Sequence, residues 1–330
     1  MSMDFFLGVD GGGTKSDLAL FDKFGKLAAR KRIGCTNHEH LPGGYAELGR
    51  MLKQATEALT KDAMVSVNQI RAGVFGLAGV DTPRQQREIT SIIQAGILKN
   101  AYVYNDAYLA IKAGCPNGFG AAAVNGTGCT VAGIDRRGEQ MQIGGLGDAS
   151  GDCGGGDYLA GQMLASVYAS LYKNAPKTVM TDLLRRTVGA AAEQSVFNEV
   201  MDLMQSGDLL RSDLNKIVFQ AANQEDSQAR EILVKMGVEN GRSLNSLIDV
   251  LDFGRAFDVV FGGSIYVKGE NPTAIEMIKK TVTEAHPDRS IRFHSLGYPL
   301  VTGAAIWAAE IFLPPELYAP FYRQALQSIA

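Results

Sequence analysis

One pattern occurs twice in this chain: an apolar run leads into a glycine-rich turn, and a second apolar run follows. The first copy spans residues 5–25 and the second spans residues 119–138. At an offset of 113 residues the copies match at five positions, pairing Gly13 with Gly126, Thr14 with Thr127, Ala19 with Ala132, Asp22 with Asp135 and Gly25 with Gly138. Each copy predicts strand, glycine turn, strand and hairpin, which indicates a duplicated domain facing a cleft. Two unrelated glycine turns are the alternative.

Between and after the two copies, apolar stripes with helical spacing alternate with short apolar runs. In the first half we expect helices at 43–63, 83–95 and 107–113 and strands at 70–77 and 101–104. In the second half we expect a helical insertion at about 157–252, strands at 257–261 and 291–294, and helices at 272–285 and 303–312. Strands separated by amphipathic helices indicate an α/β fold with a partly parallel sheet.

Length, charge and cysteine content limit the classes of partner. A chain of 330 residues predicts two domains, and 32 Lys and Arg against 35 Asp and Glu leave a net charge of −3. No basic stretch is long enough to follow a phosphate backbone, so we expect a small-molecule ligand and no nucleic acid. We also expect no membrane association, because no run approaches the ~18 apolar residues of a membrane span. With no CxxC pair among four cysteines and no signal-peptide pattern, the sequence predicts a cytoplasmic protein.

The first glycine turn has the residue types that hold an anion. Asp10 ends an apolar run, three glycines allow backbone N–H groups to approach a ligand closely, and a hydroxyl follows them. The residues expected to bind a nucleotide phosphate are Gly11, Gly12, Gly13, Thr14 and Lys15. A tight hairpin with surface polar groups is the alternative. The second turn repeats the same device with Gly126, Thr127 and Gly128, which favours the phosphate interpretation.

A third glycine turn follows an apolar run near the end of the chain. It consists of Gly262, Gly263 and Ser264, and it leaves room for a flat ligand to lie against the backbone. This turn suits the adenine and ribose end of a nucleotide. Close packing of a helix on a strand is the alternative interpretation.

Asp106 is the candidate catalytic residue, because it follows one expected strand and opens the next expected helix. A carboxylate at the C-terminal edge of a strand in an α/β domain can take a proton from a substrate hydroxyl. The alternative is that Asp106 caps the helix, a role that is compatible with catalysis.

Residues 144–156 are too rich in glycine for a regular element. A flexible surface loop is one interpretation, and a loop that binds substrate hydroxyls through Asp152 and backbone groups is the other. Asn37 is a neutral donor and acceptor that suits a polyol.

These motifs, in this order, resemble the BadF/BadG/BcrA/BcrD ATPase-like family and, within it, the N-acetylglucosamine kinases of the sugar kinase, Hsp70 and actin superfamily. The resemblance is carried by residues 9–15, 36–38, 105–106, 126–128, 144–147, 151–152, 222–226 and 262–264. Each motif alone is weak, whereas the ordered series covers nearly the whole chain.

The resemblance implies two RNase H-like, actin-like ATPase domains that flank a nucleotide cleft. The first domain would comprise residues 1–115 with a returning C-terminal helix at about 303–330. The second would comprise residues 116–302 and contain the helical insertion. The implied activity is ATP-dependent phosphorylation of an amino or N-acetylated hexose with Mg²⁺, and we expect a homodimer.

The resemblance also implies a role for individual residues. The first and second glycine turns would hold the phosphates of ATP, with Asp10 bearing on the Mg²⁺ and its waters. Asp106 would be the base that activates the sugar hydroxyl. The sugar would contact Asn37, Asp106, Cys129, Gly145, Leu146, Gly147 and Asp152, and the nucleoside would contact Ala222, Gly262, Gly263 and Ser264.

Three positions depart from the pattern of the N-acetylglucosamine kinases. Glu39 and Leu146 stand where those kinases tend to carry Trp, and Cys153 stands where they carry Glu. A ring that would stack on the apolar face of the sugar is therefore missing. We expect the natural sugar to be N-acetylglucosamine or a related amino, N-acetylated or acyl sugar.

Two other functions fit parts of the sequence. An ATPase activator of a 2-hydroxyacyl-CoA dehydratase or benzoyl-CoA reductase shares the family and would hold a [4Fe-4S] cluster, for which Cys129 and Cys153 are the candidate ligands. A non-catalytic ATP-dependent sugar sensor is the third possibility, with Asp106 acting only as a cap. The long helical insertion and the matches at Asn37 and Asp152 favour a kinase.

Overall fold

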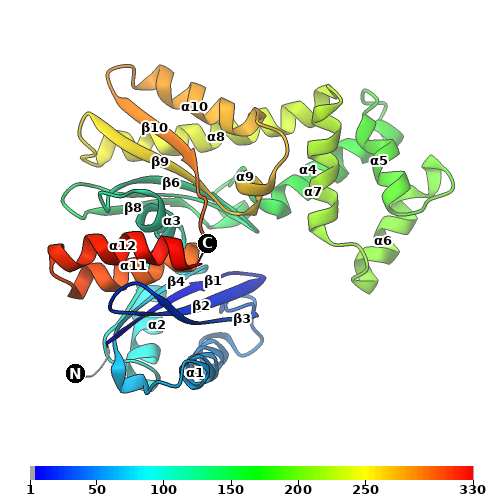
Figure 1. Ribbon diagram of the computed structural model, residues 1–330. Helices are drawn as coiled ribbons and strands as arrows, with labels where there is room; N and C mark the ends of the chain where they lie inside the picture. The colour runs from blue at the N-terminus through cyan, green and yellow to red at the C-terminus, as the bar shows by residue number, and fades with distance from the viewer. Residues whose placement is uncertain (1–3, 330) are drawn as a thin grey trace.

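The computed structural model describes residues 4–329, which form two five-stranded sheets with helices between and around them (Figure 1). The first sheet has the strand order β3-β2-β1-β4-β5. In it β1 is antiparallel to β2 and parallel to β4. Its strands are β1 (Phe5–Gly11), β2 (Lys15–Asp22), β3 (Leu27–Gly34), β4 (Ile70–Leu77) and β5 (Ala101–Tyr104).

The second sheet repeats this topology. Its order is β10-β9-β6-β7-β8, with β6 antiparallel to β7 and parallel to β9. Its strands are β6 (Gly120–Asn125), β7 (Cys129–Ile134), β8 (Gln140–Gly144), β9 (Ala256–Gly262) and β10 (Ser290–Ser295). Both sheets therefore contain an antiparallel meander joined to two parallel strands, and the expected two-domain, actin-like α/β fold is confirmed.

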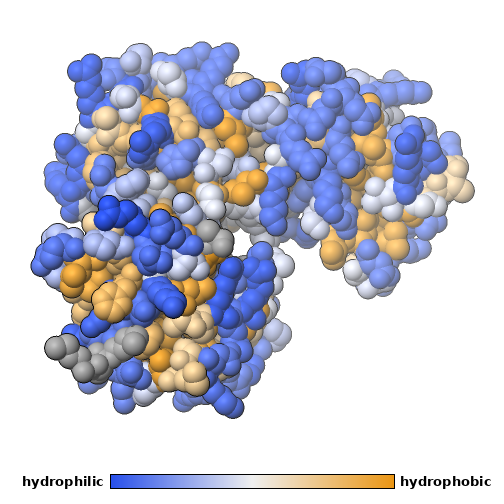
Figure 2. Space-filling view, viewed as in Figure 1, coloured by the Kyte–Doolittle hydropathy of each residue, from blue (hydrophilic) through white to orange (hydrophobic). Residues whose placement is uncertain are grey.

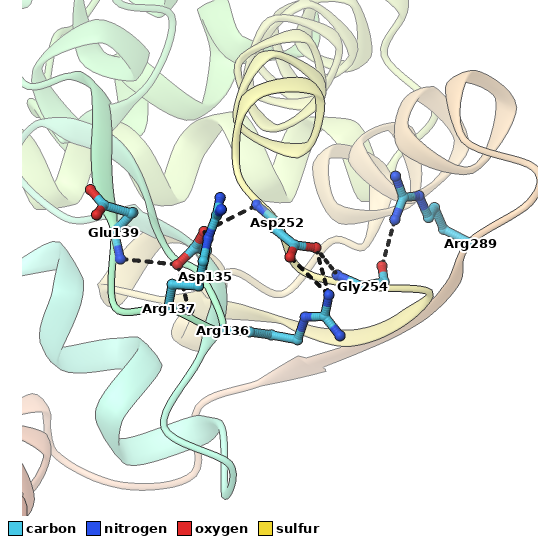
Figure 3. Close-up of polar contacts among 7 residues, drawn as sticks. All are labelled: Asp135, Arg136, Arg137, Glu139, Asp252, Gly254 and Arg289. Atoms are coloured by element: carbon cyan, nitrogen blue, oxygen red, sulfur yellow. Dashed lines mark hydrogen bonds and ion pairs between the residues drawn. The ribbon is translucent and has the colours of Figure 1, made fainter.

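The duplication extends to the hydrogen bonds of the β-hairpins. In the first hairpin, Asp22 Oδ1 accepts from the backbone N–H groups of Phe24 and Lys26 at 2.9 and 3.0 Å. In the second, Asp135 Oδ1 accepts from the equivalent groups of Arg137 and Glu139 at 2.7 and 2.9 Å (Figure 3). This agreement in detail supports the repeat that the spacing of 113 residues predicts.

The two hairpins differ in what covers them. Asp135 also accepts from the backbone N–H of Asp252, which follows α8, and Arg136 pairs with the Asp252 carboxylate (Figure 3). Asp135 is thereby fully buried. The first hairpin instead packs under the C-terminal helix, where Ser328 Oγ donates to Gly25 O at 3.0 Å.

Helices cover both faces of the first sheet. On its outer face lie α1 (Gly44–Asp62) and α2 (Pro83–Gly96), and α1 buries Leu48, Leu52, Ala55 and Leu59 against the strands. On its inner face, between the two sheets, lie α3 (Ala107–Gly114), α11 (Leu300–Phe312) and α12 (Pro315–Ile329) (Figure 1). The inner helices share one apolar core with residues of both sheets.

The second sheet carries α8 (Ser227–Val250) and α10 (Thr273–Ala285) on its outer face. A helical lobe extends from it and contains α4 (Gly155–Tyr172), α5 (Val179–Thr187), α6 (Val196–Ser206) and α7 (Arg211–Asn223). A short helix, α9 (Ser264–Lys268), follows β9. Figure 2 shows the surface hollowed between the helical lobe and the first sheet.

The structure corrects the sequence-based prediction at the C-terminal end. The expected helix at 303–312 is confirmed as α11, whereas the returning segment expected as one helix at about 303–330 is two helices, because Leu313 leaves the helical conformation ahead of Pro314 and Pro315. Proline lacks the N–H that would continue α11. None of the described helices in residues 4–329 is long and apolar enough to cross a bilayer.

The hairpin comparison gives a stability prediction. Replacing Asp135 by Ala leaves three backbone N–H groups without their acceptor, and hydrogen bonds to charged groups contribute about 1.5–3 kcal/mol each. We expect Asp135→Ala to lower the free energy of unfolding by at least about 2 kcal/mol. The matched change Asp22→Ala, at a more exposed hairpin with two bonds, should cost clearly less. Urea denaturation measures both, and equal losses would contradict the assignment.

Candidate active site

The glycine turn after β1 of the first sheet contacts the glycine turn after β6 of the second sheet. Thr14 Oγ1 and Thr127 Oγ1 lie 3.2 Å apart, so one hydroxyl donates to the other. A Cβ built on Gly13 would lie 4.0 Å from Thr127 Cγ2. The structure thus brings together the two turns that the sequence assigned to phosphates.

The glycines of the two turns serve different purposes. A Cβ at Gly11 would collide with Leu77 and Thr36, and one at Gly12 would lie 2.8 Å from Lys15 O, so protein packing itself requires glycine there. A Cβ at Gly126 or Gly128 would meet no atom within 4 Å. Nothing in the protein requires glycine at these two positions, and their backbone is open to a ligand.

The third glycine turn packs against the second. Gly263 has φ +82°, and a Cβ there would collide with the backbone of Asn125, the last residue of β6. This confirms close packing as one reason for the glycine. Ala222 is buried near the end of α7, and its neighbour Asn223 bonds to Glu270 O and Asn271 in the segment that follows α9.

Asp10 and Asp106 are two half-buried carboxylates whose pKa values are both raised. Burial, together with the charges of Asp106 and Asp17, raises the pKa of Asp10 to about 8, against the opposing charges of Lys15 and Arg30. Burial, together with the charge of Asp81, raises the pKa of Asp106 to about 7. A carboxylate with a pKa near neutrality is suited to general acid–base chemistry.

Asp106 occupies the N-cap position of α3, yet its side chain forms no capping hydrogen bond. The neighbouring Asn105 does this instead, since its Oδ1 accepts from the backbone N–H of Ala107 at 2.9 Å. The geometry therefore assigns the cap of α3 to Asn105, and the interpretation of Asp106 as a cap alone is not supported.

The loop after β8 is shaped by Asp152. One carboxylate oxygen accepts from the backbone N–H groups of Gly145 and Gly147, both at 2.9 Å, and the other accepts from Ser150 Oγ at 2.7 Å. Residues 144–147 of this loop are the segment that the resemblance assigns to the sugar, and for that reason they are called the sugar loop below. Leu146 at its tip exposes 55% of its surface, so an apolar side chain is presented to solvent.

Two further predicted substrate residues belong to different sheets, since Asn37 follows β3 of the first sheet and Cys129 begins β7 of the second. Asn37 is buried, its Oδ1 accepts from the backbone N–H of Glu39 at 3.0 Å, and a Cβ at Gly79 would collide with the same oxygen. Cys129 contacts the sugar loop through its backbone, because Gly145 N donates to Cys129 O at 3.0 Å.

The thiol of Cys129 points into the second domain. It donates to Asn240 Oδ1 at 2.7 Å, and burial raises its pKa to about 12. Cluster ligands are thiolates, whose formation at Cys129 is disfavoured by this environment. The geometry therefore speaks against Cys129 as an iron–sulfur ligand.

The comparison with known proteins agrees with this arrangement. A family model described as the BadF/BadG/BcrA/BcrD ATPase family matches residues 7–308. The chain belongs to this family. It is 27% identical over 303 residues to an N-acetyl-D-glucosamine kinase of Dictyostelium discoideum. The matched region covers 88% of this chain and 94% of that protein.

Solved structures share the fold of this family member. A candidate N-acetylglucosamine kinase of Chromobacterium violaceum is 19% identical, with a TM-score of 0.67 over 93% of this chain and 99% of that one. A glucokinase of the ROK family from Streptomyces griseus, solved with glucose and AMPPNP, is 17% identical, with a TM-score of 0.57 over 93% and 99%.

Sequence reasoning missed two residues, Asp81 and Gln142, at the site of this BadF/BadG/BcrA/BcrD family member. Asp81 lies in the loop after β4 and accepts hydrogen bonds from Asn105 and Gln142. The rule that identified Asp106, a carboxylate just beyond the C-terminal end of a parallel strand, applies equally to Asp81. Gln142 carries no local signal, because only the fold brings β8 to this position.

The raised pKa of Asp106 makes the free energy of unfolding depend on pH. Between its ordinary pKa near 4 and about 7, the folded protein holds a proton that the unfolded chain has released, so stability falls as pH rises through this range. Asn is neutral at every pH. We expect Asp106→Asn to be more stable than the native protein by about 1–3 kcal/mol near pH 8.5, with the gain vanishing near pH 4. Thermal melts at a series of pH values measure the difference in stability between Asp106→Asn and the native protein. Asp182→Asn, at an exposed carboxylate, is the control. A stability gain in Asp106→Asn that does not depend on pH would contradict the raised pKa.

Proposed function

We propose that this protein is an ATP-dependent kinase that transfers the γ-phosphoryl group to a hydroxyl of an amino or N-acetylated hexose, with N-acetylglucosamine the first candidate. The observation that carries the proposal is the meeting of two glycine turns beside a carboxylate of raised pKa. The name of the Dictyostelium discoideum relative supports the choice of substrate.

The phosphates of ATP would lie between the two glycine turns. Gly12 to Lys15 supply N–H donors, a hydroxyl and a cation on one side, and Gly126 to Gly128 supply open backbone on the other. The nucleoside would lie toward Ala222 and the turn formed by Gly262, Gly263 and Ser264. The link between the end of α7 and the segment after α9 supports this side of the proposal.

Asp10 fits the role of a Mg²⁺ ligand or of an acceptor for its waters. Magnesium ions are usually held by one or two carboxylates together with substrate phosphates and water. Asp10 is a carboxylate whose proton affinity is raised by burial and by neighbouring acids, and a divalent cation would favour its ionised form. When bound, the ion would offset charge on the phosphates.

Asp106 would orient the sugar hydroxyl and accept its proton. As the hydroxyl oxygen forms its bond to the γ-phosphorus, the bond to the bridging oxygen of ADP breaks and ADP carries that electron pair. The proton passes to Asp106, whose pKa of about 7 matches the working pH of a cytoplasmic base. Asn37, the sugar loop and Asp152 would hold the sugar.

The sugar site would be less aromatic than in the kinases that the sequence resembles. Leu146 is exposed at the tip of the sugar loop, and Glu39 is held by Gln85 Nε2 at 2.9 Å. An aliphatic tip can cover an acyl group or the apolar face of a sugar, whereas Glu39 adds negative charge. Sugars with a free amino group are therefore included among the candidates.

We further propose that the domains divide at about residues 115 and 302, and that sugar binding draws them together. All four cysteines are free, which suits a reducing cytoplasm. Homodimer formation, use of a small-molecule substrate, and the absence of nucleic-acid and membrane partners remain part of the proposal.

Nucleotide binding should depend on the open backbone of the second turn. A Val side chain at Gly126 meets no protein atom at its Cβ, so the fold should survive while the side chain occupies the phosphate position. We expect Gly126→Val to weaken ATP binding at least about tenfold in calorimetry, equivalent to ~1.4 kcal/mol. Gly161→Val on the exposed face of α4 is the control. Native affinity in Gly126→Val would rule out a phosphate site at this turn.

The role of Asp106 is tested by the same Asn substitution in an activity assay. General base catalysis contributes about 10²- to 10⁴-fold in rate. We expect Asp106→Asn to lower kcat for sugar phosphorylation at least about a hundredfold while ATP affinity stays near native. Release of ADP in the presence of sugar is the measurement. If the Asn variant keeps most of its turnover, another residue is the base.

A further inference from the structure

Asp81 is an acidic residue within the site to which the proposed mechanism gives no role. It lies in the loop between β4 and α2 and is half-buried. Burial raises its pKa to about 6, against the hydrogen bonds from Gln142 and Asn105 that favour its charged form. Burying a charged group costs free energy, so we expect Asp81 to have a function that offsets this cost.

The start of α2 holds the backbone of Asp81 in place. Thr82 and Gln85 form a capping box, in which Thr82 Oγ1 accepts from Gln85 N at 3.3 Å and Gln85 Oε1 accepts from Thr82 N at 2.9 Å. Gln85 Oε1 also accepts from Asp81 N at 3.1 Å. The position of Asp81 is therefore fixed by the first domain before any ligand arrives.

One oxygen of Asp81 joins the two sheets. Asp81 Oδ1 accepts from Asn105 Nδ2 at 2.9 Å and from Gln142 Nε2 at 2.7 Å. Asn105 belongs to the first domain, where it caps α3 and precedes Asp106. Gln142 belongs to β8 of the second sheet, directly before the sugar loop.

The sugar loop also approaches Asp81 directly. Gly145 has φ +90°, and a Cβ there would lie 2.7 Å from Asp81 Oδ1 and 3.1 Å from Thr130 Oγ1. Only glycine both adopts this conformation readily and lets the loop backbone pass so close to the carboxylate. The same Gly145 donates its N–H to Asp152.

We infer that Asp81 is a positioning residue that holds the sugar loop in register with Asp106 and so sets where the substrate hydroxyl lies relative to the base. This inference rests on the proposed function. Asp81 would act through Asn105 and Gln142 and not by touching the reacting atoms. Asn105 and Gln142 both donate to Asp81 Oδ1. Removing this oxygen therefore removes one restraint on the sugar loop and one on the residue before Asp106 at the same time.

The two hydrogen bonds by which Asp81 links Asn105 to Gln142 are called the bridge below. Hydrogen exchange of the ligand-free protein tests the bridge without any sugar. We expect Asp81→Ala to speed amide exchange in residues 140–147 and at the first turn of α3, while the distant β9 keeps its native rates. Gln140→Ala, at the exposed start of the same strand β8, is the matched control and should leave both segments unchanged. Native exchange in Asp81→Ala at both segments would overturn the bridge.

The positioning role is tested by steady-state kinetics. Misplacing a reacting group by about 1 Å can cost ~10²-fold in rate. We expect Asp81→Ala to lower kcat/KM for the sugar about ten- to a hundredfold, with KM for ATP changed less than about twofold. Asp81→Asn, which keeps an acceptor oxygen at the same place, should recover most of the activity. Equal losses toward ATP and sugar, or no recovery in Asp81→Asn, would contradict the role.

A double-mutant cycle separates the bridge from a general loss of stability. If Gln142 acts through Asp81, Asp81→Ala combined with Gln142→Ala should lose no more kcat/KM than Asp81→Ala alone. Losses that multiply would show two independent effects and would refute the bridge. A native protein that phosphorylates no sugar would instead refute the proposed function, and the exchange experiment would still decide whether the bridge exists.

Discussion

The arrangement of the whole molecule depends on how closely α11 lies against both its neighbours. A Cβ on Gly8 of β1 would collide with the backbone of α11 at Val301 and Ala305, and a Cβ on Gly303 of α11 would collide with the backbone of α3 at Leu109. Backbone therefore packs directly on backbone, and the helix pair forms a thin, closely packed layer between the two sheets. The glycine turns meet because this layer sets the distance between the sheets in the ligand-free protein.

The duplicated fold divides the chemistry between its two copies. The first copy contributes the acidic residues Asp10, Asp81 and Asp106, and the second contributes open backbone at Gly126 and a loop organised by Asp152. Burial raises the pKa values of these three carboxylates, and neighbouring acidic groups add to the effect, which reduces the stability of the ligand-free protein at neutral pH. Active sites commonly reduce the stability of the folded protein in this way, because function requires charged groups to lie in partly buried positions.

The sequence predicted the fold well because the repeat, the apolar periodicity and the turn residues are all local signals. Gly25 and Gly138 mark equivalent hairpins in sequence and in structure. Part of the candidate site could be predicted, because the glycine turns can be recognised from their residue types alone. Asp81 and Gln142 could not be paired in advance, because their hydrogen bond forms only once β8 is placed against the first domain. The distinction between packing glycines and open glycines likewise needs the tertiary neighbours of each Cβ.

The proposed function requires that a phosphoryl group moves from ATP to a sugar held between the two domains. Mass spectrometry of amino and N-acetylated hexoses incubated with the protein, ATP and Mg²⁺ detects this transfer. We expect one sugar to gain a single phosphoryl group and ADP to form in equal amount. ADP without a phosphorylated sugar, or no ADP with any sugar in the panel, would contradict it.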